Sequence, residues 1–202
     1  MNRQEAEEAL GIIRKVIRNT HEDLIAHNWG LIWMVHAFLN LGGFWAVGHF
    51  IEHRDHPVTW YLIPLAVTAA LDLGVILILL KRDQGIRSFI EWQLHGIWVT
   101  FILFSIAGVG FLHLSKGPAT LFGPIMALTS GIGFSLMGIV FYRRFLLFGA
   151  LFFVLTLTAP LLVEFQWLAI GLGWFVALFS SGLSMHLEKG RREQEGTGSE
   201  IA

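Results

Sequence analysis

Long apolar blocks alternate with short polar segments along the chain. Six of these blocks contain about 20 residues each, the length at which a helix crosses a hydrocarbon core of about 30 Å. They cover residues 28–51, 59–80, 89–114, 119–142, 145–163 and 166–187. We therefore expect an all-α fold, a polytopic helical bundle with six transmembrane helices that forms a transmembrane domain of residues 28–187.

The two ends of the chain differ from these blocks. Residues 5–25 repeat apolar positions with a period near 3.6, and their charged residues gather on the opposite side. Residues 1–27 are therefore expected to form a cytoplasmic amphipathic helix that lies in the membrane interface, packs against a second copy, or docks a regulatory partner. Residues 188–202 are rich in Gly, Glu and Ser, and we expect a disordered cytoplasmic tail.

The positive charges gather on one side of this predicted topology. All but two of the 14 Lys and Arg residues precede the first span, follow the last, or lie between spans two and three or four and five. Arg54 and Lys116 are the two on the other side. Because cytoplasmic loops carry the excess of Lys and Arg, we expect both termini in the cytoplasm and the chain in the cytoplasmic (inner) membrane of a bacterium.

The composition supports membrane insertion and excludes several other classes of protein. Hydrophobic residues make up 54% of the chain and charged residues 14%, whereas a soluble domain carries about 25% charged residues. The absence of cysteine excludes disulfides and thiolate metal sites. A net charge of −1 gives no reason to expect nucleic-acid binding. The expected partners are therefore the lipid bilayer and either a membrane partner subunit or further copies of the chain in a homo-oligomer.

Five polar residues inside the predicted spans fall near one depth. Asp72 lies nine residues, about 13 Å, from the cytoplasmic end of its span. His36 and His95 lie at a similar depth in spans one and three, with Asn40 one turn above His36 and Glu91 one turn below His95. Intramembrane carboxylates usually face a partner or a water-filled cavity. Two interpretations remain open: a proton-coupled or cation site in which Asp72 titrates and a histidine relays, and a hydrogen-bonded network that fixes helix packing.

A second group of candidate ligands lies on the opposite side of the predicted membrane. The run HFIEHRDH contains His49, Glu52, His53 and His56, and His113 lies near the outer end of span three. Histidines at i and i+4 face the same side of a helix, which is a common spacing of metal ligands. Pro57, however, disfavours helix at the preceding residue. A metal site and ordinary interfacial histidines therefore remain alternatives.

Histidines on spans one and three also raise the question of haem. His36 with His95, and His49 with His113, would be two axial pairs. The two histidines of span one are 13 residues apart and those of span three 18, which corresponds to about 20 Å and about 27 Å of helical rise. Two stacked haems therefore fit poorly. No cofactor is predicted, and a metal ion or a single haem at His36 and His95 are the alternatives.

Two stretches carry a resemblance to a known group of proteins. The first is the opening IIRKVIRNTHEDLIAHNWGLIWMVHAFLNLGGFW, and the second is RRFLLFGALFFVLTLTAPL, which precedes a glycine-rich last span and a basic C-terminus. They resemble uncharacterised bacterial six-span membrane proteins with an amphipathic N-terminal helix. Members of this group are often encoded beside winged-helix transcriptional regulators, so the resemblance implies a signalling or stress-related role in the membrane.

The sequence contains no catalytic motif that we can identify. A glycine-rich phosphate loop, a nucleophile elbow and a zincin motif are all missing from it. We therefore expect a non-enzymatic integral membrane protein that acts as an interaction, sensory or accessory subunit. The alternative is a small proton- or cation-coupled transporter or channel that uses Asp72, His36 and His95. A metal- or haem-binding membrane protein is the third interpretation.

Overall fold

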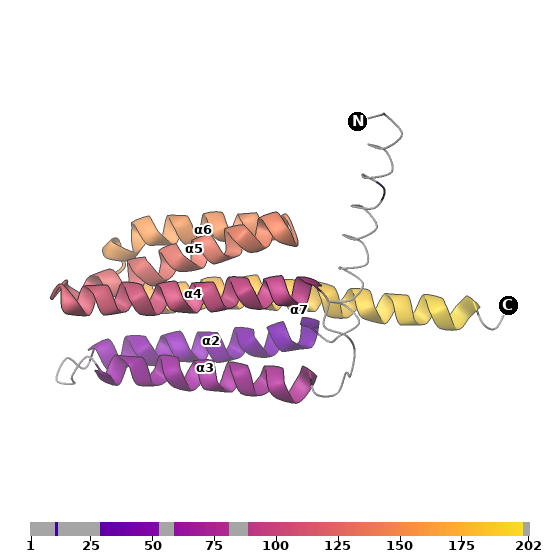
Figure 1. Ribbon diagram of the computed structural model, residues 1–202, viewed down its shortest axis with the longest axis horizontal. Helices are drawn as coiled ribbons and strands as arrows, with labels where there is room; N and C mark the ends of the chain where they lie inside the picture. Colours follow the sequence, from indigo (N-terminus) through magenta and orange to yellow (C-terminus); the bar gives the residue numbers. More distant parts are fainter. Residues whose placement is uncertain (1–10, 12–28, 53–58, 81–88, 200–202) are drawn as a thin grey trace.

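The computed structural model describes residue 11 and residues 29–52, 59–80 and 89–199. In these ranges the chain forms helices joined by short turns and contains no β-strand (Figure 1). The long helices are α2 (Trp29–Glu52), α3 (Thr59–Leu80), α4 (Phe89–Leu114), α5 (Phe122–Val140), α6 (Arg144–Thr158) and α7 (Gln166–Ser199). Short 3₁₀ turns, η1 (Ala119–Leu121) and η2 (Ala159–Leu161), precede α5 and follow α6. The predicted helix of residues 1–27 lies outside the described residues, apart from residue 11.

Among the described residues, five helical segments are long and apolar enough to cross a membrane. They belong to α2, α4, α5, α6 together with η2, and α7. α3 contains 22 residues, and the stretch of it whose side chains are described, Ile63–Leu79, is a further apolar helical segment. Apolar side chains also cover the outside of the bundle; on α4, for example, Phe104 and Phe111 are 65% and 69% exposed. A bundle that is apolar both inside and outside is suited to insertion into lipid.

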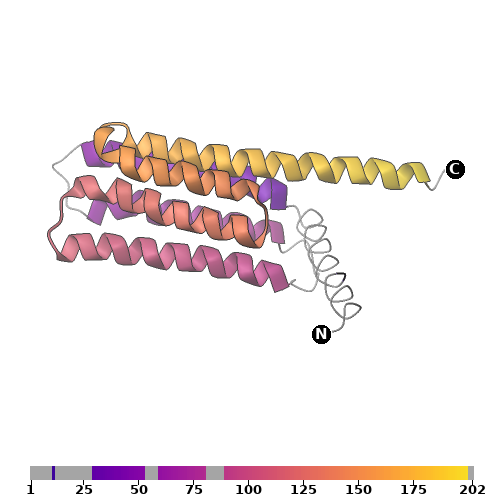
Figure 2. The same cartoon turned by 90° about the horizontal axis from the view of Figure 1, so that it is seen from above.

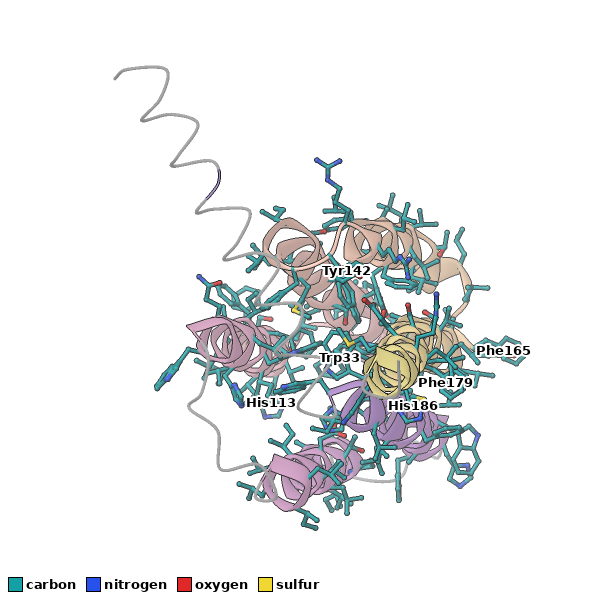
Figure 3. All side chains as sticks on the ribbon, turned by 90° about the vertical axis from the view of Figure 1, so that its right-hand side faces the viewer. Trp33, His113, Tyr142, Phe165, Phe179 and His186 are labelled. Atoms are coloured by element: carbon teal, nitrogen blue, oxygen red, sulfur yellow. The ribbon has the colours of Figure 1, made fainter. Side chains whose placement is uncertain are left out.

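The helices pack as a ring in the order α3, α2, α7, α6, α5 and α4. Packing is most extensive between α2 and α7 and between α5 and α6, whereas α3 packs mainly on α2 and α4 mainly on α5. Figure 3 looks along the bundle and shows this arrangement end on. Contact between α3 and α4 is marginal at most. The ring is therefore not closed by packing at that point, and each of these two helices is held mainly from one side.

Aromatic rings form the core among α4, α5, α6 and α7. The buried ring of Phe134 on α5 packs on Phe152 of α6 and Trp174 of α7, with ring centroids 5.2 and 5.0 Å away. Trp98 of α4 contacts both Phe134 and Trp174. The indole Nε1 of Trp174 donates a hydrogen bond to Ser130 Oγ at 3.0 Å. This hydrogen bond gives the buried indole N–H of Trp174 the partner that buried tryptophans usually find.

Glycines determine how closely α2 and α7 approach. A Cβ atom on Gly30 of α2 would lie 2.7 Å from the carbonyl oxygen of Gly182 on α7. A Cβ atom on Gly182 would lie 2.5 Å from the carbonyl oxygen of Gly30. Farther along α7, a Cβ atom on Gly171 would lie 3.1 Å from Phe44 Cβ. Small residues let helix backbones approach closely in membrane proteins, and we call this contact the α2–α7 seam.

Three segments differ from the bounds predicted by the hydrophobic pattern. α6 ends at Thr158 and continues as η2, because Pro160 has no N–H group to donate within a continuing helix. α5 begins at Phe122, so Pro124 falls in its first turn, where proline requires no kink. The tail predicted to be disordered is instead helical as far as Ser199. Its Glu, Arg, Lys and Gln residues are good helix formers, and the helix carries α7 past the ends of its neighbours (Figure 2).

Candidate functional site

Three polar side chains join α2 to α3. His36 and Asn40 are one turn apart on α2 and therefore face the same side. The Asn40 side-chain nitrogen Nδ2 donates hydrogen bonds to Asp72 Oδ2 at 3.1 Å and to the His36 carbonyl oxygen at 2.9 Å. The His36 ring nitrogen Nε2 lies 3.2 Å from the Asp72 carbonyl oxygen and 3.6 Å from Asp72 Oδ1. We call His36, Asn40 and Asp72 the polar cluster.

The position of Asp72 follows from the face that α3 turns toward α2. The apolar residues of this face, which pack on the core, are Leu65, Ile76 and Leu79. Thr68, four residues before Asp72, fills the space in front of Gly43 on α2, and its hydroxyl donates to the Pro64 carbonyl oxygen at 2.8 Å. Because Gly43 has no side chain, α3 approaches α2 closely one turn from the polar cluster. This approach brings Asp72 within hydrogen-bond distance of Asn40.

One oxygen of the Asp72 carboxyl group lacks a hydrogen-bond partner among the described residues. Oδ1 is buried, and no donor in the described ranges satisfies it. His36 Nε2, at 3.6 Å, is beyond the usual limit of about 3.2 Å for an N–H···O bond. The side chains of His36 and Asp72 are 13% and 21% exposed. A buried oxygen without a donor destabilises a protein by about 1–3 kcal/mol, so this atom is the least satisfied part of the cluster.

His95 and Glu91 lie on α4, which packs on α5 rather than on α3. The His95 ring lies edge-on to the Trp29 ring, with centroids 6.1 Å apart. Trp29 precedes His36 by seven residues, about 10 Å along α2. His95 therefore lies beside a different level of α2 from the polar cluster, although the sequence places the two histidines at similar depth. The side chain of Glu91 is outside the described part of the structure.

The predicted metal ligands are only partly described. The exposed His49 ring stacks on the Trp45 ring, with centroids 5.8 Å apart. His113 is exposed in the last turn of α4 and is labelled in Figure 3. His53, His56 and the side chain of Glu52 lie outside the described residues. Among the side chains that are described, no three His, Asp or Glu residues gather in a way that could hold a metal ion.

A single haem between His36 and His95 finds no support in the geometry. His36 Nε2 is next to Asp72, and the His95 ring is next to Trp29. Two axial ligands of one haem would instead share the iron between them. A haem at this place would therefore require both rings to leave the contacts that they make.

Other buried polar groups were not singled out by the sequence pattern. Ser130 Oγ accepts from Trp174 and donates to the Met126 carbonyl oxygen at 2.7 Å. At the start of α7, Gln166 Oε1 and Trp167 Nε1 are buried without a partner in the described ranges. A single Ser or Gln in an apolar run gives no signal of its own, because a hydroxyl often bonds to its own helix. The partner across the bundle becomes evident only from the fold.

Comparisons with protein-family models, with characterised proteins and with solved structures find no match to this chain. The resemblance to six-span bacterial membrane proteins therefore stays a prediction. The function must be argued from the polar cluster and the bundle that contains it.

Proposed function

We propose that this chain is an integral membrane protein of six spans whose polar cluster binds a proton, as part of a small proton-coupled transporter or channel. α3 is the sixth span in this proposal, because it has 22 residues and packs along α2. The end of the bundle that carries Arg143, Arg144 and Lys189 faces the cytoplasm, in agreement with the positive-inside rule. The membrane is the inner membrane of a bacterium.

The proposal rests on Asp72 Oδ1, which has no hydrogen-bond partner among the described residues and lies 3.6 Å from His36 Nε2. A network that served packing alone would be expected to satisfy both carboxyl oxygens, because half-satisfied buried networks are destabilising. A proton on Oδ1 turns this atom into a donor toward His36 Nε2 or a neighbouring carbonyl oxygen. Carboxylates and histidines inside membrane helices commonly belong to ion and proton paths.

A proton fits the polar cluster better than a metal cation. Ca²⁺ requires six to eight oxygen ligands and Mg²⁺ a near-octahedral set. Asn40 directs its amino group at Asp72 Oδ2, and His36 presents a nitrogen on the other side. The neighbours of the carboxyl group are thus nitrogen atoms and not the several oxygen ligands that Ca²⁺ or Mg²⁺ requires.

The experiment that tests the proposal is carbodiimide labelling of Asp72 in the purified chain. A protonated carboxyl group in apolar surroundings adds across dicyclohexylcarbodiimide and rearranges to a stable N-acylurea, which peptide mass spectrometry locates. We expect labelling of Asp72 that falls as the pH rises and that sodium or potassium ions do not suppress. Unlabelled Asp72 throughout the pH range, in folded protein, would contradict proton binding, and protection by sodium would replace the proton with a cation.

Function is tested by proton flux into liposomes that contain the protein and a pH-sensitive dye. Asp72→Asn should abolish the flux while the protein still folds, because the asparagine carbonyl can accept the same hydrogen bond from Asn40. His113→Asn is the matched control, since this exposed histidine lies at the end of α4, away from the cluster. If Asp72→Asn unfolds the bundle and the wild type shows no flux, the cluster serves packing.

A second candidate function is that of a non-enzymatic interaction or sensory subunit. One observation favours it: α7 continues to Ser199 and projects beyond the other helices (Figures 1 and 2). A projecting helix is available to a partner subunit in a way that a lipid-covered helix is not. Deletion of residues 191–202 should then abolish co-purification of that partner and leave the thermal stability of the bundle unchanged. A chain that loses stability on this deletion needs the extension for its own folding, which would contradict this function.

A further inference from the structure

Two adjacent arginines lie where α5 turns into α6. α5 ends at Val140 and α6 begins at Arg144, so Arg143 and Arg144 occupy the corner between the two helices. Both are exposed, whereas the next residue, Phe145, is 2% exposed and packs on Trp33. The apolar segment that is long enough to cross a membrane starts at Arg144 itself. With this segment across the membrane, as proposed above, the two guanidinium groups lie at the boundary between hydrocarbon and headgroups.

The Arg144 side chain is held in place by two other elements. Its Nη1 donates a hydrogen bond to Ser184 Oγ on α7 at 3.1 Å. Its guanidinium carbon lies over the Tyr142 ring, 5.6 Å from the centroid. Tyr142 is labelled in Figure 3, at the end of the bundle where α5 meets α6. An arginine that is held by a hydroxyl and an aromatic ring presents its remaining donors in a fixed direction.

Neither arginine is neutralised by an acidic side chain in the described ranges. The contacts of Arg144 within them are those with Ser184 and Tyr142, and Arg143 makes no ion pair there. Glu188 and Lys189 follow Ser184 on α7 by four and five residues and add one charge of each sign. A guanidinium group has five N–H donors, of which Ser184 takes one.

We infer that Arg143 and Arg144 bind the phosphate group of an anionic phospholipid, with Ser184 and Tyr142 as positioning residues. The planar guanidinium matches the geometry of phosphate oxygens and can bond to two of them at once. Phosphate groups are the anions found at this depth of a membrane, and anionic lipids attract each interfacial arginine by an amount that corresponds to about a fivefold gain in affinity. The site is formed by α6, α7 and the turn before α6, and it is independent of the polar cluster.

The test compares lipid retention by the full-length chain in detergent micelles supplemented with phosphatidylglycerol or phosphatidylcholine. Native mass spectrometry counts the lipids that remain bound. We expect the wild type to retain phosphatidylglycerol preferentially and the double variant Arg143→Gln/Arg144→Gln to lose about 30-fold in affinity for it. Lys116→Gln is the control, because Lys116 is exposed at the opposite end of the bundle. The affinity of Lys116→Gln for phosphatidylglycerol should fall by at most a small fraction of the decrease in the double variant.

Further variants keep the test decisive. Arg144→Lys retains the charge but not the planar group, so we expect it to fall between the wild type and Arg144→Gln. If the double variant does not fold, Arg143→Gln alone is the test. No hydrogen bond or ion pair of the Arg143 side chain is seen among the described residues, and the substitution leaves the backbone bond from Leu146 N–H to the Arg143 carbonyl oxygen in place. Equal retention of the two lipids by the wild type, or an equal loss in Lys116→Gln, would overturn the inference. Inorganic phosphate in the millimolar range should not displace the lipid; if it does, the site binds free phosphate instead.

Discussion

A methyl group added at Gly30 should force α2 and α7 apart. Its carbon would lie 2.7 Å from the Gly182 carbonyl oxygen and 2.9 Å from the His186 backbone nitrogen. An ordinary contact is about 3.5 Å, so the two backbones must separate by roughly 0.8 Å. Both obstacles are backbone atoms, which cannot rotate out of the way. Overpacking of this kind destabilises a protein by about 1–3 kcal/mol, and we expect a loss of this size for Gly30→Ala.

Gly42→Ala on the same helix is the matched control. A Cβ atom on Gly42 would have nothing within 4 Å. Alanine is also the better helix former by about 1 kcal/mol, so this variant should be as stable as the wild type or slightly more stable. Thermal unfolding in detergent, followed by tryptophan fluorescence, measures both. In a chain of this length about 1 kcal/mol shifts Tm by roughly 2–4 °C. Equal Tm values for Gly30→Ala and Gly42→Ala would refute the argument that the α2–α7 seam depends on glycine.

Two further predictions concern the buried polar contacts. Ser130→Ala removes the acceptor of the Trp174 indole and should lower the free energy of unfolding by about 1–3 kcal/mol. Chemical or thermal unfolding measures this loss. An unchanged free energy of unfolding would mean that the indole finds another acceptor. Asn40→Ala leaves Asp72 without its donor and should destabilise the bundle by a similar amount. Asn40→Ala combined with Asp72→Leu should recover most of that loss, because the buried carboxyl group is then absent. If the double variant is no more stable than Asn40→Ala, the loss of stability does not come from the hydrogen bond between Asn40 and Asp72.

The helices themselves could be predicted closely from the apolar blocks. The bounds of α3 and α4 coincide with the predicted residues 59–80 and 89–114, because each block ends at polar or charged residues. The ends of α5 and α6 depended on Pro124 and Pro160, whose effect varies with their place in the turn. The sequence did not predict the extension of α7, because the same polar composition is found in disordered tails and in solvent-exposed helices. Whether α3 completes six spans remains a prediction.

The arrangement of the polar cluster could be predicted only in part. Depth along each span brings His36, Asn40 and Asp72 to one level, and consecutive helices joined by a short loop tend to be neighbours. The same reasoning places His95 beside them, but α4 packs on α5 and its histidine lies against Trp29. Depth gives the level of a residue and not its position around the ring. The position around the ring depends on glycine contacts between helices that are far apart in the sequence. Which glycines meet cannot be predicted from a single sequence.

The α2–α7 seam has a consequence for how the chain is made. α2 is synthesised before α7, and more than half of the chain separates them. In a chain that inserts into the membrane during synthesis, α2 would enter long before its principal partner has left the ribosome. Its glycine-lined face would be covered meanwhile by lipid or by an insertion factor. Contacts between distant parts of a chain form slowly and leave early segments exposed to wrong pairing. A ribosome that stalls before α7 would therefore leave an unfinished bundle in the membrane, a substrate for membrane proteases.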